Sequence, residues 1–205
     1  MELPGFTQSD PLFPGINLSY HEQTYVRGKP KKYLLYTIEL FQKFTDAKVI
    51  VEVGSARGRM GHDISEFNPA CCNDGHSTYF WKHYTSAEIY SVDINPGCKR
   101  LIDNDERLKG VNAITQDAIA FLETFDKKID LLFLDAWDVE EGTPYAEEHL
   151  RAYLTCKKNL SDRCLILIDD TDVGGRGKGR VVIPKLIEDG FKCLTEGRQT
   201  LFFRM

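Results

Sequence analysis

The sequence lacks the C-x-x-C spacing of zinc ribbons and thioredoxin-type redox sites, although it contains six cysteines. It also lacks long apolar runs, since none approaches the ~20 residues that a transmembrane helix needs, and we expect no membrane partner. The first residues show neither the basic nor the apolar segment of a secretory signal. These absences together predict a cytoplasmic protein with reduced thiols.

Basic residues are fewer than acidic ones. The chain of 205 residues has 26 Lys and Arg against 31 Asp and Glu, which gives a net charge of −5. An acidic chain is a poor candidate for binding nucleic acid, because that affinity depends on neutralising phosphates. Hydrophobic residues make up 42% and charged residues 28%, an ordinary globular balance that fits a single domain.

Strand and helix patterns alternate along most of the chain. We predict helices over 31–44, 77–84, 97–108, 118–125, 146–160 and 179–190. We predict strands over 48–54, 87–94, 110–117, 129–136, 163–170, 191–197 and 199–205. This alternation predicts an α/β fold with a doubly wound, largely parallel sheet. Because only a tight turn joins the last two of the seven strands, the last strand is predicted to be antiparallel.

Two segments do not fit this alternation. Residues 1–30 are rich in Pro, Gly and aromatics, which favours an N-terminal arm or lid packed on a single domain over 31–205. Residues 55–74 carry Gly, Asn and Pro and are interpreted as an insertion loop. His62, Cys71, Cys72 and His76 form a weak zinc alternative there, because adjacent cysteines are poor chelate spacing.

Each of the first five strands delivers a carboxylate at its carboxyl end. In doubly wound sheets this is the edge where ligands bind. Surface carboxylates kept only for solvation would lie at both ends of the sheet, so the asymmetry indicates a site. The residues are Glu52, Asp93, Asp117, Asp135 and the pair Asp169-Asp170.

The end of the first strand favours a nucleotide-like ligand. Gly54 lets the backbone approach a ligand closely, and Asp93 can accept both hydroxyls of a ribose. The G-x-G-x-x-G turn of dinucleotide sites is absent, which counts against a nicotinamide oxidoreductase. Ser77 and Thr78, at a helix start, are suited to bind a carboxylate or to cap the helix.

These motifs resemble class I S-adenosylmethionine-dependent methyltransferases. The closest likeness is to the small metal-dependent O-methyltransferases of the catechol and macrolide-sugar kind, whose first motif reads E-x-G-[ST]…G-x-S-T. Here Glu52-x-Gly54-Ser55 supplies its first half and Gly75-x-Ser77-Thr78 its second, separated by the insertion at 56–74. The resemblance covers roughly 48–205 and implies a Rossmann-like fold.

The resemblance also implies roles for individual residues. S-adenosyl-L-methionine would be the cofactor, with its ribose on Asp93 and its carboxylate on Ser77. Glu52 would orient the loop, and Trp137 could stack on the adenine, although core packing explains it nearly as well. The implied cofactor-binding residues are Glu52, Gly54, Ser55, Gly75, Ser77, Asp93, Asp117, Ala118, Asp135 and Trp137.

Asp135, Asp169 and Asp170 would bind a divalent metal, in the terms of the same resemblance. Three clustered carboxylates suit a hard cation such as Mg²⁺. The alternative is a solvated turn at 169–172 with hydrogen bonds from its Asp side chains. Asp135 would take part in catalysis, and Asp138 stands where relatives carry a basic residue as the general base. His149 and His76 are alternative bases.

The segment 174–180, GGRGKGR, leads into the helix predicted at 179–190. It could bind a phosphate or carboxylate of a substrate. The alternative, which we favour, is a flexible surface loop with solvated charges.

These features predict metal-dependent O-methylation of a hydroxyl on a small natural product or sugar. A metal-independent N-methyltransferase and a non-catalytic S-adenosylmethionine-binding subunit are the alternatives. The chain could also form a homodimer. The acceptor cannot be named, because a fold does not fix its substrate.

Overall fold

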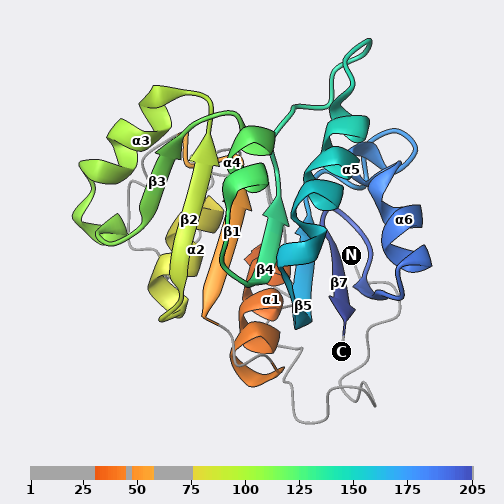
Figure 1. Ribbon diagram of the computed structural model, residues 1–205, viewed down its shortest axis with the longest axis horizontal. Helices are drawn as coiled ribbons and strands as arrows, with labels where there is room; N and C mark the ends of the chain where they lie inside the picture. Colours follow the sequence, from red (N-terminus) through yellow and green to blue (C-terminus); the bar gives the residue numbers. More distant parts are fainter. Residues whose placement is uncertain (1–30, 45–47, 58–75, 205) are drawn as a thin grey trace.

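The computed structural model describes residues 31–44, 48–57 and 76–204 (Figure 1). The predicted arm at 1–30 and most of the insertion at 55–74 lie outside the described residues. The zinc alternative, with Cys71 and Cys72, lies there as well. No helix in the described ranges is long and apolar enough to cross a membrane.

The described elements follow the predicted alternation. The helices are α1 (Lys31–Phe44), α2 (His76–Tyr84), α3 (Pro96–Asp103), α4 (Ala118–Thr124), α5 (Tyr145–Cys156) and α6 (Val182–Glu188), with short 3₁₀ turns at Glu106–Leu108, Lys157–Asn159 and Gly177–Gly179. The strands are β1 (Val49–Val53), β2 (Glu88–Asp93), β3 (Asn112–Thr115), β4 (Ile129–Leu134), β5 (Leu160–Ile168), β6 (Lys192–Thr195) and β7 (Thr200–Arg204).

The strands form one seven-stranded sheet in the order β3-β2-β1-β4-β5-β7-β6. The first five are parallel, whereas β7 runs antiparallel between β5 and β6. This confirms the predicted doubly wound, Rossmann-like α/β fold with an antiparallel last strand. The order reverses between β1 and β4, which is the position where such sheets open a crevice for ligands.

Helices cover both faces of the sheet, as near-continuous apolar strands require. In Figure 1, α4, α5 and α6 lie in front of the sheet and α1 lies behind it. Side chains of β1 alternate between the faces: Val51 and Val53 belong to the core under α4, α5 and α6, and Ile50 to the core under α1 and α2. Glu52 therefore points to the α1 and α2 face, where a charge needs partners.

Two element bounds differ from prediction for identifiable reasons. Strand β5 begins at Leu160 and not at the predicted residue 163, because Leu160 pairs with Ile129 of β4 and Ser161 Oγ donates to Asp130 Oδ1 at 2.6 Å. Helix α6 begins at Val182, after a separate 3₁₀ turn at 177–179. Pro184 then falls in the first turn of α6, where its missing N–H costs nothing.

Candidate functional site

A cavity of about 340 Å³ opens beyond the carboxyl ends of β1, β2 and β4. We call it the strand-end cavity. Its volume is within the range of small-molecule sites. It is lined by Gly54, Arg57, Val92, Asp93, Ile94, Asn95, Asp117, Ala118, Asp135, Ala136, Trp137 and Asp138.

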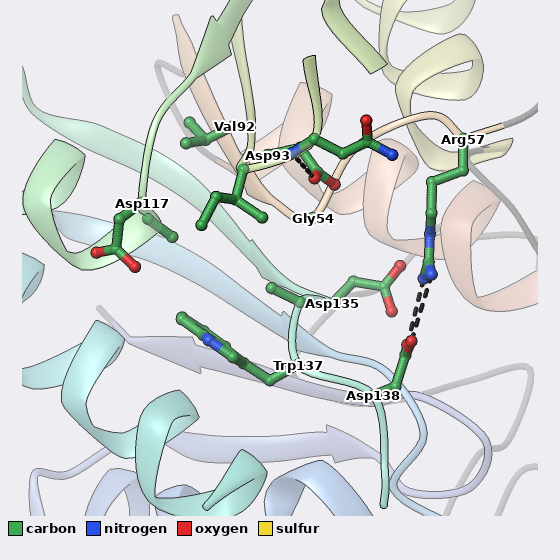
Figure 2. Close-up of a pocket in the computed structure, with 12 residues that line it drawn as sticks. Gly54, Arg57, Val92, Asp93, Asp117, Asp135, Trp137 and Asp138 are labelled. Carbon is green, nitrogen blue, oxygen red and sulfur yellow. Dashed lines mark hydrogen bonds and ion pairs between the residues drawn. The ribbon is translucent and has the colours of Figure 1, made fainter. Parts of the chain in front are cut away.

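The cavity brings together residues from four separate strand ends, as the sequence predicted. Figure 2 shows Asp117 and the Trp137 ring at one end of the cavity and Arg57 and Asp138 at the other. Among the predicted cofactor residues that line it are Gly54, Asp93, Asp117, Ala118, Asp135 and Trp137. Glu52, Ser55 and Ser77 do not line it, and Gly75 lies outside the described residues.

Gly54, directly after β1, packs against the backbone that follows β4. Its φ is +93°, a conformation that side chains rarely adopt. A Cβ atom here would lie 2.8 Å from the Ala136 nitrogen and from the Asp135 carbonyl carbon. The glycine therefore keeps the floor of the cavity open between two backbone segments.

Asp93, at the tip of β2, is held by two backbone groups. Its Oδ2 accepts from the Ser55 N–H at 3.1 Å and its Oδ1 from the Asn95 N–H at 2.8 Å. The carboxylate remains partly exposed toward the cavity and keeps lone pairs for further donors. Such a carboxylate can accept hydrogen bonds from a pair of ligand hydroxyls.

Glu52 lies on β1, two residues before Gly54, and is fully buried. It accepts from Thr78 Oγ1 at 2.5 Å, from Ser91 Oγ at 2.6 Å and from Trp81 Nε1 at 3.1 Å. Its carboxylate thus joins β1 to β2 and to α2. These hydrogen bonds reach α2 and β2, so the predicted orientation of the loop by Glu52 stays a prediction, and Thr78 is a partner for Glu52 that the sequence did not reveal.

Asp117 both caps a helix and lines the cavity. Its Oδ1 accepts from the Ala120 N–H at 3.0 Å and caps α4, while the residue also lines the cavity. Ile94, directly after Asp93, lines the cavity too and is 73% exposed, which sequence analysis missed. Its position next to a strand-end acid was the available signal.

Arg57 and Asp138 form an ion pair at the outer end of the cavity. The two guanidinium nitrogens each lie 3.3 Å from a carboxylate oxygen, as the dashed lines in Figure 2 mark. Both side chains are well exposed, at 43% and 67%. Asp138 therefore lines the cavity with an exposed carboxylate that is paired with Arg57.

His149, a predicted alternative base, lies on α5 and does not line the cavity. It is fully buried, and its Nδ1–H donates to the Tyr145 carbonyl at 2.5 Å. Burial lowers the pKa of His149 to about 4, so its ring is neutral near pH 7. The side chain of His76, the other alternative, lies outside the description.

The three predicted metal ligands, Asp135, Asp169 and Asp170, do converge. One oxygen from each lies within 4.8 Å of the others, and we call this group the acidic cluster. Between two of its members lies a cation of the chain itself: Lys178 Nζ is 2.9 Å from Asp135 Oδ1 and 3.0 Å from Asp170 Oδ2. The expectation of a solvated charge at Lys178 is wrong, because its side chain is only 1% exposed.

Two further side chains hold the acidic cluster from the C-terminal hairpin. Arg198 forms an ion pair with Asp170, and Gln199 Nε2 donates to Asp169 Oδ1 at 2.8 Å. An additional Mg²⁺, at about 2.1 Å from one oxygen of each carboxylate, would lie close to the ammonium of Lys178, which already contacts two of them. The cluster therefore does not fit a divalent ion in addition to the lysine.

Comparison with known proteins agrees with this architecture. A family described as methyltransferase domain matches residues 51–171, more than half of the chain, and the chain belongs to that family. No curated protein matches the sequence. The resemblance of this chain to class I methyltransferases is thus confirmed at the level of family and fold.

Solved structures share the fold at low sequence identity. One is a proposed caffeoyl-CoA O-methyltransferase from Staphylococcus aureus, with 15% identity, a TM-score of 0.58, and coverage of 91% of this chain and 88% of that one. The SAH-bound methyltransferase PaMTH1 from Podospora anserina has 16% identity and a TM-score of 0.58, and the match covers 91% of this chain and 85% of that one. The N-methyltransferase NodS from Bradyrhizobium japonicum has 12% identity and a TM-score of 0.54, and the match covers 85% of this chain and 95% of that one.

Proposed function

We propose that the chain binds S-adenosylmethionine in the strand-end cavity and transfers its methyl group to a small acceptor. The observation that carries this proposal is the convergence of Gly54, Asp93 and Asp117 on one cavity at the reversal of strand order. Support comes from the methyltransferase family and from a neighbour that is SAH-bound.

Each lining residue has a task in this proposal. Asp93 accepts hydrogen bonds from the ribose hydroxyls, and Gly54 gives the methionine part room beside the backbone. The indole of Trp137 and the side chain of Ile94 supply apolar surface for the adenine near Asp117. The sulfonium methyl would then face the outer part of the cavity.

The acceptor is proposed to be a hydroxyl oxygen of a small molecule, which attacks the methyl group in line. Positioning of the two reactants supplies most of the rate. Asp138 is the candidate for removing the proton, because it lines the cavity and is exposed to the acceptor side. The divalent metal suggested by the resemblance has no part in this proposal, because Lys178 lies in the acidic cluster.

Titration of S-adenosylmethionine by calorimetry tests the proposal. Wild type should bind one cofactor, and Asp93→Asn should bind it about 10- to 100-fold more weakly, as expected for a lost charged hydrogen-bond acceptor. Asp103→Asn is the matched control, since Asp103 is an exposed carboxylate on α3 that pairs with Lys99. Absence of binding in folded wild type would overturn the proposal.

A panel of small hydroxyl and amine acceptors, followed by mass spectrometry for the added methyl group, then tests the chemistry. Methylation confined to hydroxyl acceptors supports the proposal. Methylation of amines alone would favour the N-methyltransferase alternative. Cofactor binding without turnover on any acceptor would favour a non-catalytic subunit.

A further inference from the structure

Lys178 is a buried cation whose ammonium is surrounded by oxygens of the acidic cluster. Its ammonium lies 3.0 Å from the Asp135 carbonyl oxygen, 2.9 Å from Asp135 Oδ1 and 3.0 Å from Asp170 Oδ2. An ammonium has three N–H donors, and three oxygens surround this one. Two of these contacts are hydrogen bonds to Asp135 and the third is an ion pair with Asp170, so the ammonium is bound to both carboxylates.

The backbone that carries Lys178 is shaped for this position. Gly177 has a φ of +44°, and a Cβ there would overlap the carbonyl oxygen of Asp170. A Cβ on Gly179 would overlap the side chain of Ile183. Glycines on both sides thus let the loop pack against the end of β5 and direct the lysine inward. The glycine-rich segment thus allows the burial of a cation.

The chain itself balances part of the negative charge of the acidic cluster. Lys178 and Arg198 bring two positive charges to three carboxylates, and the Gln199 amide satisfies one oxygen of Asp169. A divalent ion bound to Asp135 and Asp170 would be placed beside a buried ammonium. Like charges in such surroundings repel strongly, because little solvent screens them.

We infer that Lys178 replaces the divalent cation of the acidic cluster, so that this chain holds its cofactor and transfers methyl groups without a metal. The inference rests on the proposed function for its catalytic part. Lys178 acts as a positioning residue: it fixes Asp135, which lines the strand-end cavity, in one orientation. The metal-binding part of the inference can be tested without an acceptor.

The first test titrates Mn²⁺ into metal-free wild type, with free Mn²⁺ followed by electron paramagnetic resonance. We expect no stoichiometric binding, and calorimetry should give the same affinity for S-adenosylmethionine in EDTA and in excess Mg²⁺. One bound Mn²⁺ per chain that disappears in Asp169→Asn would overturn the inference. Failure of the proposed function looks different, because S-adenosylmethionine would then bind in neither buffer.

The second test removes the internal cation. Lys178→Met removes the ammonium from the two carboxylates that it contacts, Asp135 and Asp170, and should raise Mn²⁺ affinity at least about tenfold, a gain that Asp169→Asn should cancel in the double variant. Lys109→Met is the control, because Lys109 is 82% exposed and far along the chain from the cluster. Folded Lys178→Met without added Mn²⁺ affinity would count against the inference. If this variant does not fold, the wild-type titration still decides.

Discussion

The indole of Trp137 lies edge-on against the imidazole of His149, with ring centroids 5.2 Å apart and planes at 79°. The Trp137 ring, which lines the cavity, thus packs against the fully buried ring of His149. Trp137 also has a φ of +50°, a strained conformation for a bulky residue. The contact with His149 helps to hold the indole at the cavity, since strain of this kind persists only where the surroundings fix it.

Tryptophan fluorescence should report cofactor binding through this residue. The chain has two tryptophans. The other, Trp81, is fully buried, and its Nε1–H donates to Glu52. Addition of S-adenosylmethionine should change the emission of wild type and of Trp81→Phe. Trp137→Phe should bind without the spectral change, as parallel calorimetry would show. A signal that survives in Trp137→Phe would contradict the placement of the ligand.

Gly54→Ala should destabilise the protein and close the cavity floor. The new Cβ would meet two backbone atoms at 2.8 Å in a positive-φ conformation, so we expect a loss of about 2–4 kcal/mol in the free energy of unfolding. Urea unfolding measures this loss. Gly142→Ala is the matched control: its φ of +82° is similar, but no atom lies within 4 Å of the added Cβ. Equal losses in both variants would show that close contact at Gly54 is unimportant.

Glu52→Ala should destabilise the junction of β1, β2 and α2. Three buried donors lose their shared acceptor, and we expect a loss of about 3 kcal/mol or more in the free energy of unfolding. Glu123→Ala, on the exposed face of α4, should leave stability nearly unchanged. Denaturant unfolding with the cofactor absent separates this effect from binding. A loss as small as that of Glu123→Ala would show that Glu52 is not the hub described.

Stability should fall on acidification partly because of His149. Burial lowers its folded-state pKa from 6.5 to about 4, so below pH 6.5 the unfolded state binds a proton that the folded state does not. This stabilising contribution is complete above pH 6.5 and is lost as the pH falls toward 4. Between pH 7.5 and 5 it amounts to about 2 kcal/mol. Urea unfolding of wild type and His149→Gln should differ in pH dependence by that amount, and parallel curves would refute the assignment.

The fold could be predicted from sequence because its signals are local. Apolar runs such as 129–134 and 164–168 define buried strands, and the short link between the last two strands defines their antiparallel pairing. The convergence of Asp93, Asp117 and Asp135 followed from topology, since parallel strands end at one edge. Register and exact bounds depend on contacts between strands, as with Ser161 and Asp130.

The position of Lys178 could not be predicted in the same way. A lysine among glycines has the composition of a solvated loop, and nothing near it in sequence indicates a partner 43 residues away. Its burial depends on the Asp170 and Asp135 carboxylates, which the fold alone brings to it. The sequence thus predicted the negative half of this cluster and missed the positive half.

The place of β7 in the sheet also governs when the site can form during synthesis. This strand inserts between β5 and β6, and the residues just before it, Arg198 and Gln199, contact Asp170 and Asp169. It is the last of the seven strands to leave the ribosome. A nascent chain that has made every other strand still exposes the β5 edge and leaves two carboxylates short of these contacts, so the acidic cluster is completed only once β7 has inserted.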